Sequence, residues 1–171
     1  GAKVLLEKAV KSDEINFGDA HPNTAVRYSN LALVLKDLGD YQGAKVLLEK
    51  AVKSDEINFG DAHPNTAVGY SNLALVLKAL GDYQRAKGLL EKAVKSDELN
   101  FGDAHPSTAR SYSNLALLLC DLGELEEALV LAKKALGIFQ VVLPVGHPTI
   151  DVVAGNVAFI QRAMEDRKNG S

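Results

Sequence analysis

Four histidines recur at one position of a repeated phrase, and imidazole serves as a metal ligand and as a general acid or base near neutral pH. The phrase reads NFGDAHPNTAV in its first two copies, and the histidines are His21, His63, His105 and His147. In the three full copies an aspartate stands two residues before the histidine, as Asp19 does before His21. A histidine near a carboxylate raises two hypotheses, a metal centre and acid–base catalysis.

The spacing of the histidines argues against both hypotheses. Consecutive copies are 42 residues apart. If each copy holds two helices packed at roughly 8–10 Å, equivalent histidines lie about 20 Å apart, too far to share one ion. Catalysis also needs one converging group of residues, whereas a repeat supplies identical separated copies. We therefore interpret each histidine as a local turn residue ahead of a proline, and Asp19 and its copies as turn and cap residues. We expect no metal, no cofactor and no enzymatic activity.

Composition narrows the partners further. A formal net charge of −3 supplies no broad positive field for nucleic acid or an anionic membrane, and no stretch approaches the roughly 18 consecutive apolar residues of a membrane span. Cys120 is the single cysteine of the sequence, which suits a reducing compartment and predicts a cytoplasmic location. No phosphate-binding glycine loop, HExxH or GxSxG motif is present.

The repeat itself determines the expected architecture. Residues 43–84 match residues 1–42 at 40 of 42 positions, the exceptions being Arg27 against Gly69 and Asp37 against Ala79. Residues 85–126 match the first unit at 31 of 42 positions. A fixed period between about 20 and 50 residues is typical of a solenoid, in which each unit buries its apolar face only against its neighbours. Because the sequence starts with Gly1, we expect a piece cut from a longer array.

Each repeat contains two helical patterns and a corner. The first, helix A, begins at Pro22 and ends at Gly39, and its apolar stripe is Tyr28, Leu31, Ala32, Leu35 and Leu38. The second, helix B, is capped by Asp40 and runs to about residue 58, and its stripe is Ala44, Leu47, Leu48, Ala51 and Val52. Residues 59–63 form the corner. The predicted helical segments are 1–16, 22–58, 64–100, 106–141 and 148–165, which we expect to supply seven helices with a half-repeat at each end and no strands.

These residues resemble the tetratricopeptide repeat (TPR) family. Tyr28 stands where the family has its Trp, and the helix B positions match at Ala44, Leu48 and Ala51. The usual TPR has 34 residues, so the longer period implies a longer helix B and corner. The blocks GDYQxAKxLLEKAV and HPxTA resemble the variant of kinesin light chains. The resemblance implies an all-α, right-handed superhelical solenoid of TPR-like antiparallel helix pairs. Residues 1–171 would form a single array, divided as 1–21 (helix B half-repeat), 22–63, 64–105, 106–147 and 148–171 (terminal helix A).

The outer stripe of helix A is the candidate binding surface, because in TPR proteins it lines the concave groove. Asparagine amides both donate and accept hydrogen bonds, which suits an extended or helical peptide, and the leucines would take apolar anchors. The candidate residues are Ser29, Asn30, Leu33, Lys36, Ser71, Asn72, Leu75, Lys78, Ser113, Asn114, Leu117, Asn156 and Phe159. TPR clamps for chaperone tails carry a Lys and a second Asn where this chain has Ser29 and Leu33, which disfavours that ligand. The structural alternative is that Asn30 bonds neighbouring helices and Leu33 packs beneath helix B.

The two ends suggest a different function. The first helix keeps the interior apolar pattern with Leu5, Leu6 and Val10, and the last one carries Val153, Val157 and Ile160. If these stripes have no partner in the chain, copies could associate head to tail, a contact that does not close on itself. The sequence therefore predicts a non-catalytic protein-interaction scaffold, with self-association as the alternative.

Overall fold

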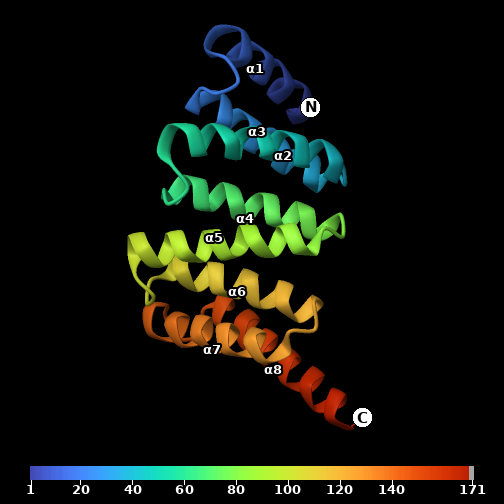
Figure 1. Cartoon of the computed structure of the whole chain (residues 1–171), viewed down its shortest axis with the longest axis vertical. Coiled ribbons are helices and arrows are strands. Elements are labelled where there is room, and N and C mark those ends of the chain that lie inside the picture. The colour runs from blue at the N-terminus through green and yellow to red at the C-terminus, as the bar shows by residue number, and fades with distance from the viewer. Residues whose placement is uncertain (170–171) are drawn as a thin grey trace. The chain divides into compact units, whose positions relative to one another are not determined.

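The computed structural model describes residues 1–169, which form eight α-helices and no strand, so the predicted all-α class of packed helix pairs is confirmed (Figure 1). The expected total of seven is wrong, because three complete pairs and one helix at each end make eight. Gly170 and Ser171, the end of the expected segment 148–171, lie outside the described residues. The helices are α1 (Ala2–Phe17), α2 (Pro22–Asp37), α3 (Tyr41–Phe59), α4 (Pro64–Ala79), α5 (Tyr83–Phe101), α6 (Pro106–Asp121), α7 (Leu125–Val142) and α8 (Pro148–Asn169).

The chain divides into two compact units, and the division falls inside α5. The first is Gly1–Ser96 and the second starts at Asp97. In the first unit α1, α2, α3 and α4 pack against one another in chain order (Figure 1). In the second, α6 packs on α7 and α7 on α8, with a smaller contact between α6 and α8. Each helix is thus covered by its sequence neighbours, as the repeat predicts.

Local signals start helix A. His21 lies in extended backbone ahead of Pro22, and its Nδ1 accepts a hydrogen bond from the Asn23 N–H at 3.2 Å. The same N-cap bond recurs at His63, His105 and His147, at 3.1, 3.1 and 3.2 Å. The ring of His21 also stacks on Phe17 with centroids 4.8 Å apart. The interpretation of the histidines as turn residues is therefore confirmed.

The turn between helices A and B combines a glycine with an aspartate cap. Gly39 has φ 81°, a conformation that side-chain-bearing residues rarely adopt. Asp40 then accepts the Gly43 N–H at 2.9 Å, which satisfies a backbone donor in the first turn of α3. Helix B ends at Phe59, one residue beyond the predicted end, and Gly60 follows with φ 86°.

The core follows the predicted stripes with one exception. Leu38 is exposed, because α2 ends at Asp37 and Leu38 is already its C-cap residue. The alanines of helix B are small, so the backbone of helix A approaches closely there. The buried stripe residues in the first complete pair are Tyr28, Leu31, Ala32 and Leu35 on α2, and Ala44, Leu48, Ala51 and Val52 on α3.

Gly88 interrupts α5 at a position where the other copies carry Val4 and Val46. A Cβ placed there meets no neighbouring atom within 4 Å, so no close contact requires glycine. We expect Gly88→Ala to raise the free energy of unfolding by about 0.5–1 kcal/mol, because alanine loses less backbone entropy in a helix. Urea denaturation measures the change. Gly81→Ala is the control and should destabilise, because Gly81 has φ 81°; equal melting of wild type and Gly88→Ala would contradict the prediction.

Candidate functional site

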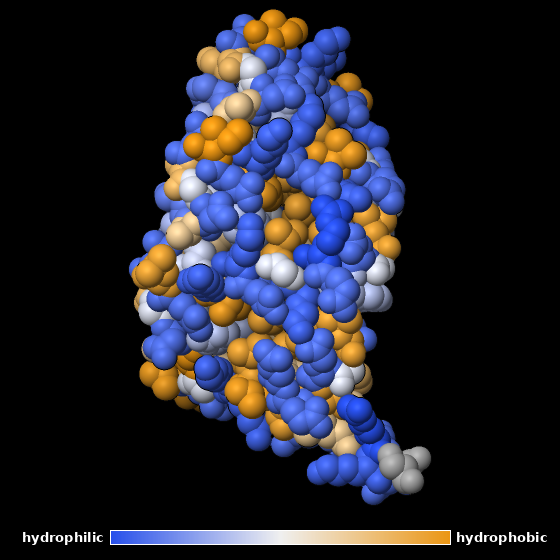
Figure 2. Space-filling model, viewed as in Figure 1, coloured by the Kyte–Doolittle hydropathy of each residue, from blue (hydrophilic) through white to orange (hydrophobic). Residues whose placement is uncertain are grey.

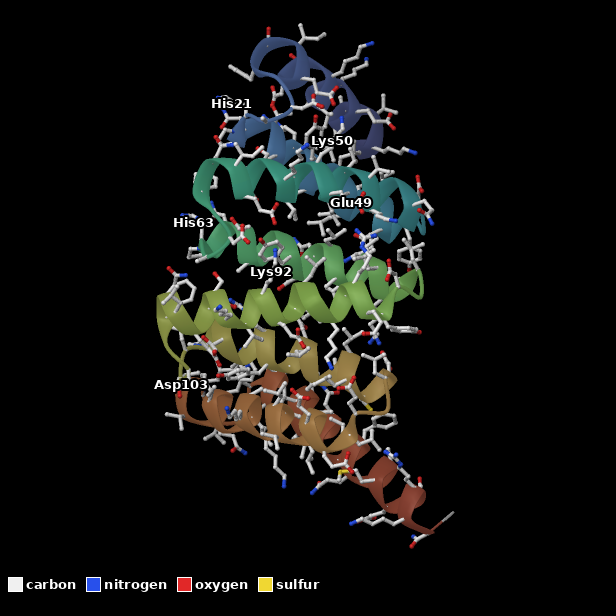
Figure 3. All side chains as sticks on the ribbon, in the orientation of Figure 1. His21, Glu49, Lys50, His63, Lys92 and Asp103 are labelled. Carbon is white, nitrogen blue, oxygen red and sulfur yellow. The ribbon has the colours of Figure 1, made fainter. Side chains whose placement is uncertain are left out.

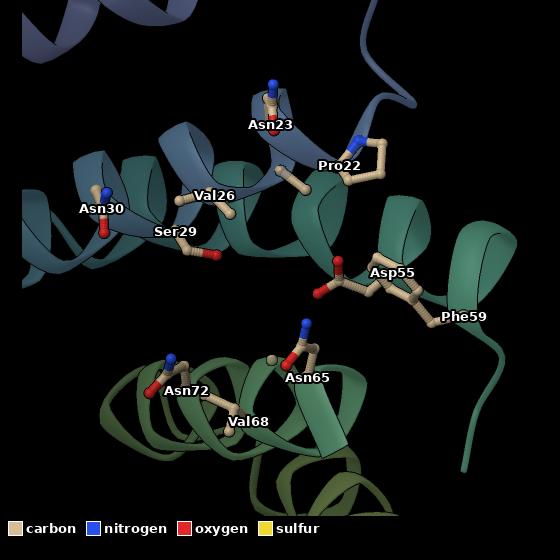
Figure 4. Close-up of a pocket in the computed structure, with 12 residues that line it drawn as sticks. Pro22, Asn23, Val26, Ser29, Asn30, Asp55, Phe59, Asn65, Val68 and Asn72 are labelled. Carbon is tan, nitrogen blue, oxygen red and sulfur yellow. The ribbon is translucent and has the colours of Figure 1, made fainter. Parts of the chain in front are cut away.

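A pocket of about 320 Å³ opens between α2, α3 and α4 in the first unit (Figure 4). Val26 and Val68 are exposed on its two sides, so the pocket is open to solvent. Polar side chains from all three helices point into a partly apolar surround, an arrangement suited to orienting a ligand. The lining residues are Pro22, Asn23, Ala25, Val26, Ser29 and Asn30 of α2, Asp55 and Phe59 of α3, and Asn65, Val68, Gly69 and Asn72 of α4.

Three of the candidate residues line this pocket, namely Ser29, Asn30 and Asn72. Within the described chain the Asn30 and Asn72 side chains form no hydrogen bond, so their amides are available to a ligand. Leu33 and Leu75 lie outside the pocket and are 36% and 42% exposed rather than packed beneath helix B.

The remaining candidates are at least partly exposed on helices A. Lys36 lies 3.9 Å from the Asp37 carboxylate. The others in the first unit, Ser71 and Lys78, are half-buried on α4. In the second unit Phe159 is exposed on α8, and the half-buried residues are Ser113, Asn114 and Leu117 on α6 and Asn156 on α8.

Asp55 is a pocket residue that the sequence did not single out. Its carboxylate extends from α3 into the space between α2 and α4 (Figure 4). Burial raises the pKa of this carboxyl, and the nearby His63 only partly offsets the effect. Among the described residues it has no hydrogen-bond or ion-pair partner. Asp55 is therefore a half-buried acidic group whose charge is not neutralised.

The same aspartate is paired in the other two repeats. Asp13 contacts the Arg27 Nε at 3.3 Å, and Asp97 accepts the Ser111 hydroxyl at 2.6 Å. In the middle repeat that partner position is Gly69, and a Cβ there would lie 3.7 Å from the Asp55 Oδ2. The Arg27 to Gly69 difference, visible in the sequence, thus removes the partner of Asp55.

A second polar cluster joins successive helix pairs at Lys50, at the position labelled in Figure 3. The buried Tyr28 donates its hydroxyl hydrogen to Glu14 at 2.8 Å. The Lys50 ammonium lies 3.2 Å from Glu14, 3.2 Å from Asp19 and 4.9 Å from the Tyr28 ring centroid. Lys50 was expected on the solvent side, and Asp19 was expected to act within its turn; instead they link α3 to the preceding corner.

The cluster repeats in the later copies with small changes. Tyr70 donates to Glu56 at 2.7 Å, and Lys92 lies 3.7 Å from that carboxylate (Figure 3). In the second unit Tyr112 donates to Glu98 at 2.5 Å. Three equivalent clusters indicate a structural link rather than one unique reactive site.

The electrostatics of the cluster point the same way. Burial and the hydrogen bond to Glu14 raise the pKa of Tyr28, so its phenol stays protonated. Burial alone would lower the pKa of Lys50, but its bonds to Glu14 and Asp19 outweigh this and raise the pKa. Neither group can exchange a proton readily near neutral pH.

The terminal stripes differ from the expectation. On α1, Leu5 is 70% exposed, Leu6 is half-buried and Val10 is buried. On α8 the residues Val153, Val157 and Ile160 are all buried. The prediction that this last stripe lacks a partner is wrong, because α8 packs it against α7 within the unit. The exposed apolar residues of α8 include Val152 and Phe159 instead.

Metal and membrane sites were also searched within residues 1–169. No cluster of three or more His, Cys, Asp or Glu side chains able to bind a metal is present in this part of the chain. None of the described helices has the length and apolarity to cross a membrane. Cys120 is a half-buried free thiol on α6.

Comparison with known families agrees with the helix-pair geometry and the buried stripes. A tetratricopeptide repeat model matches residues 28–99 and 65–140, which together exceed half of the chain. The chain belongs to the tetratricopeptide repeat family. More specifically, it is of the kinesin light chain-like variant, as its repeat blocks predicted.

Solved TPR structures share the fold. A kinesin light chain protein of Podosopora anserina with nearly identical TPR-like repeats is 27% identical, with a TM-score of 0.85 over 98% of this chain and 79% of that one. BtubC (BKLC) of P. vanneervenii is 24% identical with a TM-score of 0.84 over 96% of this chain, which spans 66% of BtubC. The Sgt2 TPR domain of Aspergillus fumigatus is 16% identical, with a TM-score of 0.63 over 85% of this chain and 82% of that domain.

The comparison with curated proteins finds no match. The TPR family and these structural neighbours support a protein-interaction scaffold with protein partners in general. The TPR fold is typically non-catalytic.

Proposed function

We propose that this TPR chain is a non-catalytic cytoplasmic scaffold that binds an extended or helical peptide of a protein partner on the helix A face. The observation that carries the proposal is the pocket between α2 and α4, where Asn30 and Asn72 present unbonded amides. A peptide backbone has alternating donors and acceptors, and an amide side chain can satisfy either. The binding needs no cofactor, nucleic acid or membrane.

The apolar residues near the amides supply the rest of such a surface. Val26 and Val68 lie beside the pocket, and Leu33 and Leu75 continue the exposed face along α2 and α4. Burying these side chains under a ligand would add a favourable hydrophobic contribution to binding. The face in the second unit, with Asn114 on α6 and Asn156 on α8, offers the same combination of residue types.

A randomised peptide library selected on the wild-type chain supplies the ligand for a direct test. We expect Asn72→Ala with Asn114→Ala to weaken the selected peptide by about tenfold, because each lost amide bond contributes up to about 1 kcal/mol. Fluorescence anisotropy measures the affinity. Asn16→Ala on α1 is the matched control, since the exposed Asn16 bonds only Ser12 within its own helix. Unchanged affinity in the double variant, with normal stability, would reject the proposal.

Head-to-tail self-association is the alternative function, and the exposure of α1 favours it. Val4 and Leu5 are 50% and 70% exposed on that helix, and exposed apolar side chains of α8 could meet them in a second copy. On the face of the molecule drawn in Figure 2, hydrophobic side chains form small patches separated by hydrophilic ones. A contact through α1 would therefore be limited in area.

Sedimentation distinguishes this alternative. If α1 mediates association, the sedimentation coefficient should rise with protein concentration, and Leu5→Glu should abolish the rise because a charge would be buried in the contact. Lys3→Glu on the same helix is the control for charge alone. A strict monomer at millimolar concentration would exclude self-association.

A further inference from the structure

Three copies of one acidic position show what its carboxylate binds. In the first copy Asp13 holds the Arg27 side chain at 3.3 Å, and in the third Asp97 accepts the Ser111 hydroxyl hydrogen at 2.6 Å. In each case the partner is one turn of helix A facing the preceding helix B. The position thus binds a donor, and a guanidinium fills it in the first copy.

The middle copy has the acceptor without the donor. Gly69 leaves Asp55 unpaired, and the missing side chain is replaced by the pocket of about 320 Å³. A half-buried carboxylate without a partner is unfavourable, and a cation brought by a ligand would compensate it. The partner that this chain supplies to Asp13 from within can therefore be supplied to Asp55 from outside.

We propose that the pocket around Asp55 takes an arginine side chain of a protein ligand. This inference rests on the proposed function and specifies the ligand chemistry at one point of the helix A face. The guanidinium would occupy the place left by the absent side chain at position 69, as that of Arg27 does beside Asp13.

Arginine fits the pocket better than lysine. A guanidinium has five donors in a plane, so it can bond the carboxylate and still reach neighbouring acceptors. Ser29 and Asn65 lie beside Asp55 and offer such oxygens (Figure 4). The aliphatic part of an arginine would pack against Phe59 and the valines at the pocket edge.

The test is an NMR titration of the whole ¹⁵N-labelled chain with acetyl-Leu-Arg-Leu-amide and its citrulline counterpart. Citrulline has the same shape as arginine but no charge. We expect saturable shifts of the Gly69 and Asn72 amides and a preference for the arginine peptide of about tenfold or more, the size of a charge-assisted bond. Asp55→Asn should abolish the preference.

Two further variants isolate the role of Asp55. Asp13→Asn makes the same change at a carboxylate already held by Arg27, and should leave the arginine preference unchanged. Gly69→Arg should remove binding by placing the chain's own guanidinium on Asp55, with a small movement of Val52, whose Cγ2 lies 3.1 Å from a Cβ at position 69. Circular dichroism checks that each variant is folded.

The outcomes separate this inference from the proposed function. A preference that survives Asp55→Asn, or no saturable shift at Gly69 up to 10 mM peptide (roughly the weakest affinity such a titration detects), would overturn the arginine site. If library peptides still weaken with Asn72→Ala and Asn114→Ala, the proposed function stands without it. If those peptides ignore both asparagines while the arginine preference depends on Asp55, the wider peptide-binding face fails and the arginine site stands.

Discussion

Tyr70→Ala is expected to lower the free energy of unfolding by about 3–5 kcal/mol, the usual cost of removing a buried aromatic side chain. Tyr70 is fully buried on α4. Its hydroxyl donates to Glu56 on α3, and Lys92 from α5 lies 4.9 Å from its ring centroid. The substitution therefore removes both core volume and the polar link between successive helix pairs. Urea denaturation followed by circular dichroism measures the change.

Two companion variants divide the effect of Tyr70→Ala. Tyr70→Phe keeps the ring and removes only the hydroxyl, so a loss of about 1–3 kcal/mol is expected from the hydrogen bond to the Glu56 carboxylate. Tyr83→Ala changes a tyrosine that is 39% exposed on α5, and should cost at most about 1 kcal/mol. Equal losses for Tyr70→Ala and Tyr83→Ala would show that Tyr70 does not hold the helix pairs together.

Ile160→Ala is expected to lower the free energy of unfolding by about 2–5 kcal/mol, because it leaves a cavity in the core of the second unit. Ile160 is fully buried, although the sequence suggested an open terminal stripe. Its neighbours on the stripe, Val153 and Val157, are buried with it where α8 packs on α7. The measurement thus tests whether α8 is part of the core.

Val152→Ala is the control for Ile160→Ala. Val152 is 63% exposed on the same helix, so its truncation should change the free energy of unfolding by no more than about 0.5 kcal/mol. Denaturation by urea compares the two variants under identical conditions. If Ile160→Ala were as mild as Val152→Ala, the stripe would be open after all, and α8 would again be a candidate for self-association.

Most of the fold could be predicted because its signals are local. Pro22 after a capping histidine starts helix A, and Gly39 with Asp40 turns the chain into helix B. These signals depend on residues close in sequence, so the predicted helix boundaries mostly lie within a residue or two of those observed. The burial of Ile160 depends instead on how α8 folds back on α7, and helical periodicity alone cannot tell a covered stripe from an open one.

The candidate site was only partly predictable for a similar reason. Helical spacing places Asn30 and Asn72 on the outer face of helix A, and both line the pocket. Asp55 belongs to helix B, and its position at the pocket depends on the register between that helix and the next helix A. The sequence does show the Arg27 to Gly69 difference, but its consequence requires knowing that this position faces the aspartate.

The most direct test of the account is to map the library-selected peptide on the whole ¹⁵N-labelled chain by NMR. The account predicts that the largest amide shifts lie on α2 and α4, at the pocket residues Asn30, Gly69 and Asn72. Val46 and Ile57 are exposed on α3 outside the pocket, so their amides should stay unchanged. Shifts centred on Val46 and Ile57, with the pocket unaffected, would contradict binding on the helix A face.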